Sequence, residues 1–154
     1  MTTLSEDRPD RPEAVAALGL GLLLTVIALI ATVVDQRSAH TIADHVYALY
    51  APFGPQPDPN TLFTFLYTIG GAGVLMWLAT IWGAKRRQRW VAAVATMIFL
   101  VGTGLSVLVL VVHEHGTRIF PVGWGVLSLL PCVLGFVAVV LLWMPHHTAS
   151  GRDL

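Results

Sequence analysis

The chain has 154 residues, of which 55% are hydrophobic and only 12% are charged, with a formal net charge of zero at pH 7 and a mean hydropathy of +0.71. A soluble domain carries about 25% charged residues, so this composition excludes an ordinary water-exposed surface. The nine basic residues also exclude a broad basic face for nucleic acid, because four of them fall in one short segment.

Four apolar segments are each long enough to cross a lipid bilayer, which takes about 20 residues in an α-helix. No acidic, basic or histidine side chain lies in the interior of any of them. The sequence therefore predicts an all-α integral membrane protein, a four-helix bundle formed by residues 14–144. Its predicted spans are residues 14–34, 62–82, 90–112 and 122–144, and residues 1–13 and 145–154 are predicted to be disordered cytoplasmic tails.

The connection between the first and second spans is the only long one. Its first half predicts a short amphipathic helix on the outer surface, because five apolar residues recur there at helical spacing. These residues are Ile42, Val46, Leu49, Tyr50 and Phe53. The proline-rich half at residues 51–60 is not expected to form regular structure, since proline lacks a backbone donor. Asn60 and Thr61 offer an N-cap for the second span.

The short loop between the second and third spans indicates the orientation. It contains Lys85, Arg86, Arg87 and Arg89. Cytoplasmic loops of membrane proteins carry an excess of lysine and arginine, so this loop is predicted to face the cytoplasm. With an even number of spans, both termini are then cytoplasmic, and the protein is expected to be a multi-pass protein of the plasma membrane.

Aromatic residues fall near both predicted borders of the spans. Rings with one polar edge and an apolar body prefer the membrane interface. Trp82, Trp90 and Trp143 are predicted at the inner interface, and Tyr50, Phe120 and Trp124 at the outer one.

Small residues are clustered within three of the spans. They allow helix backbones to approach closely, which drives helix association in lipid. The clusters are Gly70, Gly71, Ala72 and Gly73; Gly102, Gly104 and Ser106; and Ser128, Cys132 and Gly135. They predict either packing within the bundle or contact with a membrane protein partner or a second copy. Pro131 is expected to free a carbonyl in the fourth span, to be satisfied by Ser128 or a neighbour.

The candidate metal site lies in the two predicted outer loops. Imidazole nitrogen and carboxylate oxygen suit zinc or copper, and haem is a further possibility. The candidate ligands are His40, Asp44, His45, His113, Glu114 and His115. Two other interpretations remain open for the same residues: capping and solvation of helix ends, and a pH-responsive cluster.

No catalytic residue is predicted. The spans hold no titratable group near their centres, which argues against proton-coupled transport, and no nucleophile or phosphate-binding motif is present. Three functions remain. The first is a non-enzymatic accessory or structural subunit in the lipid bilayer that acts through helix–helix contacts. The others are a metal- or haem-binding membrane protein and a carrier or channel for a small neutral solute.

Overall fold

The computed structural model describes residues 12–54, 58–86, 88, 90–114 and 117–144. This part of the chain is almost entirely helical. Its α-helices are α1 (Pro12–Val34), α2 (Thr41–Tyr50), α3 (Asn60–Lys85), α4 (Val91–Val111) and α5 (Val122–Trp143). A π-helical turn, η1 (Asp35–Ala39), extends α1, and the two-residue strands β1 (His113–Glu114) and β2 (Thr117–Arg118) pair in antiparallel fashion.

Four of the helices, α1, α3, α4 and α5, are long and apolar enough to cross a membrane. Their borders agree with the predicted spans to within three residues at every end. The largest departures are in α3, which starts two residues before the predicted span and ends three residues after it. The predicted tails at residues 1–11 and 145–154 lie outside the described residues, whereas Pro12 and Glu13 belong to α1.

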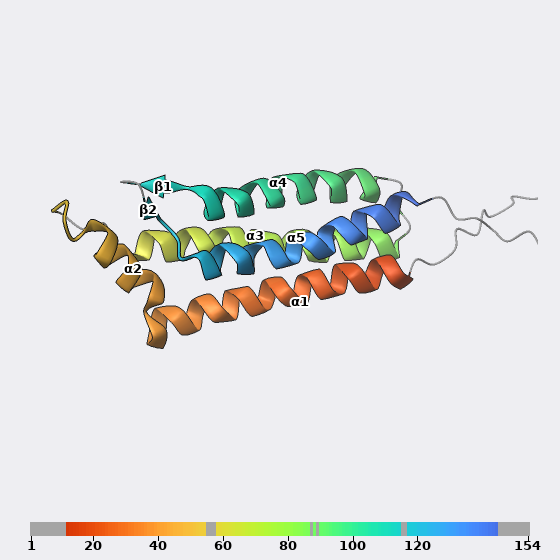
Figure 1. Cartoon of the computed structure of the whole chain (residues 1–154). Helices are drawn as coiled ribbons and strands as arrows, with labels where there is room; N and C mark the ends of the chain where they lie inside the picture. The colour runs from red at the N-terminus through yellow and green to blue at the C-terminus, as the bar shows by residue number, and fades with distance from the viewer. Residues whose placement is uncertain (1–11, 55–57, 87, 89, 115–116, 145–154) are drawn as a thin grey trace, which may run out of the picture.

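The four long helices run side by side (Figure 1). Helix α1 packs along both α3 and α5, and α4 packs along α5. Helices α3 and α4 are consecutive and joined by a short turn, yet they contact each other far less than these three pairs do.

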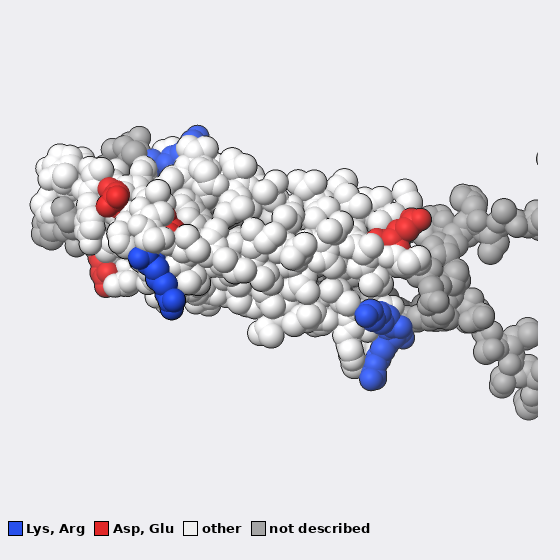
Figure 2. Space-filling view, turned by 90° about the horizontal axis from the view of Figure 1, so that it is seen from below, with Lys and Arg blue, Asp and Glu red and all other residues white. Residues whose placement is uncertain are grey.

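The two ends of the molecule differ in charge and in structure. We call the end that carries Lys85, Arg86 and the described chain ends at Pro12 and Met144 the basic end. The opposite end, with η1, α2 and the β1–β2 pair, is called the hairpin end (Figure 1). On the face seen in Figure 2, coloured charges gather toward these two ends and leave an uncharged band between them.

The main buried cluster lies near the basic end. Ala14 and Leu142 pack there against Val91 and Ala95. Gly83 makes the turn between α3 and α4 compact, because a Cβ on it would lie 2.7 Å from a methyl group of Val91. Helices α3 and α4 meet at this turn and separate beyond it.

At the hairpin end, α2 has one buried face, as its spacing predicts. Ile42, Val46 and Leu49 are buried, whereas Phe53 lies beyond the helix and is exposed. The buried carboxylate of Asp35 accepts hydrogen bonds from the backbone N–H groups of Thr41 and Ile42, at 2.9 and 3.1 Å. An acceptor at this place satisfies donors that the first turn of a helix leaves unpaired.

One smaller prediction for this end was wrong. The first turn of α3 is capped by Asp58, whose carboxylate accepts from the backbone N–H of Asn60 at 2.9 Å, and not by the side chain of Asn60. Phe120 lies at the hairpin end, next to the start of α5. It is 4% exposed and stacks with Phe65 at a ring distance of 6.3 Å. Trp82, Trp90 and Trp143 are exposed near the basic end, as expected of border residues.

Candidate functional site

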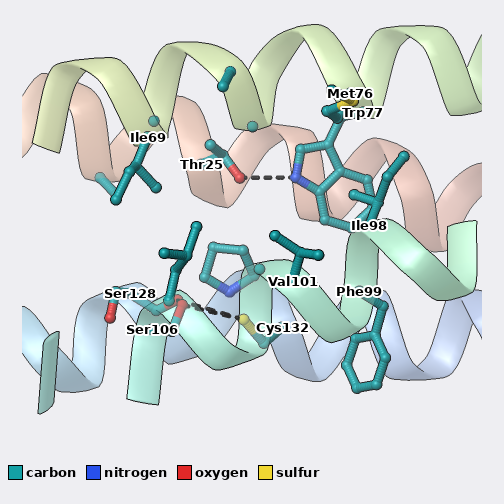
Figure 3. Close-up of a pocket in the computed structure, with 18 of the residues that line it drawn as sticks. Thr25, Ile69, Met76, Trp77, Ile98, Phe99, Val101, Ser106, Ser128 and Cys132 are labelled. Carbon is teal, nitrogen blue, oxygen red and sulfur yellow. Dashed lines mark hydrogen bonds between the residues drawn. The ribbon is translucent and has the colours of Figure 1, made fainter. Parts of the chain in front are cut away.

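An apolar cavity of about 490 Å³ lies between α1, α3, α4 and α5 (Figure 3). Known ligand pockets have volumes of about 300–1,000 Å³. Its lining runs along α3 from Leu66 to Thr80 and along α4 from Ala95 to Ser106. The cavity therefore occupies the middle of the molecule, away from both charged ends.

The predicted small-residue clusters meet at this cavity. Gly70 and Gly73 of α3 line it, as do Gly102 of α4 and Gly135 of α5. A Cβ on Gly70 would collide with Leu29 of α1, so this glycine does serve close packing. A Cβ on Gly102 would meet nothing within 4 Å, so this glycine leaves space. The small residues thus have two effects, close helix packing and open space in the cavity, and the sequence does not show which residue has which effect.

The cavity opens sideways, between α3 and α4. Three lining residues of α3, spaced four apart, form one rim: Thr68, Ala72 and Met76, all exposed. Met97 and Val101 of α4 form the other rim and are 68% and 62% exposed. The floor is formed by α1 and α5. The opening follows from the separation of α3 and α4 beyond their shared turn.

Toward both ends the helices pack shut. At the hairpin end, the Tyr67 hydroxyl donates to the Gln36 side-chain oxygen at 2.7 Å, and Phe65 stacks on Phe120. At the basic end, the lining stops at the buried cluster that contains Ala14 and Val91. In the described structure the cavity therefore does not run through the molecule from end to end.

Trp77 of α3 reaches into the cavity (Figure 3). Its indole N–H donates to the Thr25 hydroxyl at 3.0 Å, and that hydroxyl donates to the Gly21 carbonyl at 2.9 Å (Figure 3). The ring lies over Gly21, where an added Cβ would come within 2.4 Å of it. A glycine on α1 and a hydroxyl one turn later together hold the ring of α3 in place.

A second polar group lies across the cavity, on α4 and α5. The Ser106 hydroxyl donates to the Ser128 carbonyl at 3.0 Å and lies 3.4 Å from the sulfur of Cys132. Pro131 lies inside α5 and has no N–H to donate to the carbonyl of Leu127. The carbonyl that accepts from Ser106 is that of the next residue, Ser128. The hydroxyl of Ser128 donates to the Gly125 carbonyl and so does not satisfy the carbonyl of Leu127.

No charged residue and no histidine lines the cavity among the described residues. The lining does contain the free thiol of Cys132, but no carboxylate, histidine or lysine of the described residues lies beside it to act as a base. It provides apolar surface, with a few hydroxyls that are already bonded within the protein.

The predicted metal ligands lie at the hairpin end, outside the cavity. His40 is exposed and has a φ of 54°, in the left-handed region, where it ends η1 and precedes α2. Asp44 is exposed in the first turn of α2. His113 is exposed, and its Nδ1 contacts the Val111 carbonyl. Within the described part of the chain, no three histidine, cysteine or carboxylate residues are grouped to hold a metal ion.

His45 is the predicted ligand that the structure connects to the second loop. Its Nε2 donates to the Arg118 carbonyl at 2.8 Å, and Arg118 is paired with His113 across the β1–β2 ladder. Helix α2 is thereby held against the strand pair. Glu114 contributes its backbone to β1, and His115 lies outside the described residues, so the six-residue metal site stays a prediction.

Comparison with known proteins found no match to a protein-family model, a curated protein or a solved structure. The function is therefore inferred from the geometry of the chain itself. The sequence analysis named most of the small residues that line the cavity, but it predicted helix packing from them and not a cavity. The one available signal was Trp77, a bulky ring with a polar edge far from either end of its span.

Proposed function

We propose that the protein is a transmembrane four-helix bundle of the cytoplasmic membrane, with the basic end and both chain ends in the cytoplasm. The surface supports insertion, because large apolar side chains such as Leu75 and Leu100 are more than 60% exposed along the long helices. Contiguous exposed apolar surface of this extent is unusual in a soluble monomer. Lys85 and Arg86 at the α3–α4 turn support the orientation.

We propose that its function is to bind a hydrophobic molecule taken from the lipid phase. One observation carries the proposal: the cavity is packed shut toward both ends and opens sideways between α3 and α4. In a bilayer, this opening faces lipid and not water. A molecule that reaches the cavity must therefore be soluble in the hydrocarbon core.

This function is a form of the predicted carrier for a small neutral solute. A water-filled channel has less support, because a channel requires a path that links the two ends. A catalytic role also has less support, because the described lining holds no carboxylate, histidine, lysine or arginine to act as a general acid or base. Holding a hydrophobic molecule requires only apolar surface and a fixed shape.

Filling the cavity tests the proposal. Gly102 lines the cavity and has free space where a Cβ would be, so Gly102→Leu places a side chain in the hollow without a collision at Cβ. Gly104, two residues along the same helix, has the same free space but does not line the cavity. Gly104→Leu is therefore the matched control.

The measurement is the small-molecule content of the protein purified in mild detergent, by native mass spectrometry and by organic extraction. We expect a hydrophobic molecule to copurify with the wild type and with Gly104→Leu, and at least about tenfold less of it with Gly102→Leu, since a blocked apolar site loses several kcal/mol of burial. Equal content in both variants would contradict the proposal.

A further inference from the structure

The shape of the cavity limits what occupies it. Along α3 the lining from Leu66 to Thr80 covers about 21 Å, at about 1.5 Å per residue. A volume of about 490 Å³ spread over that height forms a slot less than about 10 Å wide, whereas a helix with its side chains is about 10–12 Å across. A partner helix therefore does not fit between α3 and α4, but an extended chain does.

The hydrogen-bonding groups of the slot limit the occupant further. The hydroxyls of Thr25, Thr32, Thr68, Thr80 and Ser128 all donate to backbone carbonyls of their own helices. Ser106 and Trp77 donate to neighbouring helices, and the thiol of Cys132 points to the Ser128 carbonyl. The hydrogen-bond acceptors of a polar ligand would find no free donor in the slot, and burying an unpaired acceptor in an apolar site costs free energy. The occupant of the slot itself is thus hydrocarbon.

Trp124 is the exception. It lines the cavity in the first turn of α5, at the hairpin end, and its indole N–H donates to no atom of the described residues. Among the described residues, the hydroxyl of Thr103 is the only buried side-chain donor or acceptor without a hydrogen-bond partner. The unpaired indole N–H of Trp124 is therefore not fully buried. The hairpin end of the slot is therefore lined by an indole whose N–H is not used within the described structure, whereas the basic end stops at aliphatic side chains such as Leu18 and Val139.

From this arrangement, and resting on the proposed function, we propose that the ligand is a single-chain amphiphile of the leaflet at the hairpin end. Its hydrocarbon chain lies along the slot with the tip toward the basic end. A carbonyl or phosphate oxygen of its head group accepts the indole N–H of Trp124. A zigzag chain of about 16 carbons, with bonds of about 1.5 Å, fills a slot of this length.

Two probes that differ only at the head separate this proposal from the proposed function. Hexadecane has the chain alone, and methyl hexadecanoate adds an ester carbonyl. Binding of each radiolabelled probe to the detergent-purified full chain is measured for the wild type and for Trp124→Phe, which keeps the apolar ring and removes the donor. We expect the wild type to bind the ester about threefold to tenfold more tightly, the effect of one hydrogen bond. In Trp124→Phe this preference disappears and alkane affinity is unchanged.

The outcomes are distinct. Equal wild-type affinity for the two probes, or an ester preference that survives in Trp124→Phe, would overturn the amphiphile and its orientation but leave hydrophobic binding intact. Failure of the wild type to bind either probe would end both proposals. If Trp124→Phe loses the alkane as well, its slot has collapsed, and Trp124→Leu, which also lacks a donor, is the second variant. With alkane binding intact in Trp124→Leu, loss of the ester preference supports the role of the indole N–H, and an ester preference that survives contradicts it.

Discussion

Trp77 and Gly21 illustrate how single residues shape the cavity. The Trp77 ring lies where a side chain on α1 would otherwise be, and its N–H is held by Thr25. An indole is large and rigid, so it does not yield to an added methyl group as a flexible chain would. The glycine is therefore required by the ring that crosses it and not by the conformation of the helix.

We expect Gly21→Ala to destabilise the protein by about 1–3 kcal/mol, the usual cost of overpacking. Gly19→Ala on the same helix is the control, because a Cβ there meets nothing within 4 Å and alanine favours the helix. The free energy of unfolding, measured by denaturant titration in detergent, checks both variants. In a Trp77→Leu background the cost of Gly21→Ala should largely vanish, and an undiminished cost there would show that the ring is not its cause.

At the scale of elements, the junction between α1 and α2 depends on Asp35. Its buried carboxylate lies at the end of α1 and accepts from the first two backbone N–H groups of α2. The turn between them also places His40 in the left-handed region. Together these features direct α2 away from the axis of α1, so that Ile42 and Val46 face the interior.

Asp35→Ala should cost about 1–3 kcal/mol, because it leaves two donors at a helix start without their acceptor. Asp44→Ala, an exposed carboxylate in the first turn of the same helix, should change stability little. Thermal unfolding followed by circular dichroism compares the two variants. Asp35→Asn keeps one acceptor oxygen and should lie between the wild type and Asp35→Ala. Equal stability of the alanine variants would rule out a special role for Asp35.

At the scale of the whole molecule, the proposed orientation places the basic end in the cytoplasm and the hairpin end outside. The single native cysteine simplifies its test, because Cys132→Ala gives a background without thiols. Ser38 is exposed at the hairpin end, and Gln88 lies in the α3–α4 turn at the basic end.

In that background, a membrane-impermeant maleimide should label Ser38→Cys in intact cells and label Gln88→Cys only after the membrane is permeabilised. The reverse pattern would invert the orientation and move the proposed amphiphile to the cytoplasmic leaflet. Labelling of both sites in intact cells would contradict a single fixed topology.

The accessory-subunit and metal-site hypotheses stay predictions. Capture of a stoichiometric partner would test the first, and metal analysis of the purified protein would test the second.

The sequence alone determined the four long helices and their borders. An apolar run of about 20 residues must satisfy its backbone hydrogen bonds internally in lipid, and only a helix does this within one segment. The spacing of Ile42, Val46 and Leu49 likewise predicted α2 and its buried face, because local periodicity reports which side of a helix is apolar.

The tertiary structure alone decided where the helices separate and what the small residues do. Gly70 and Gly102 are the same residue in similar apolar sequence, yet one is covered by Leu29 and the other leaves empty space. The difference depends on which neighbouring helix faces each glycine, and that pairing involves residues far apart in the chain. The cap by Asp35 and the free donor of Trp124 were hidden for the same reason, since a hydrogen-bond partner is known only once the chain is folded.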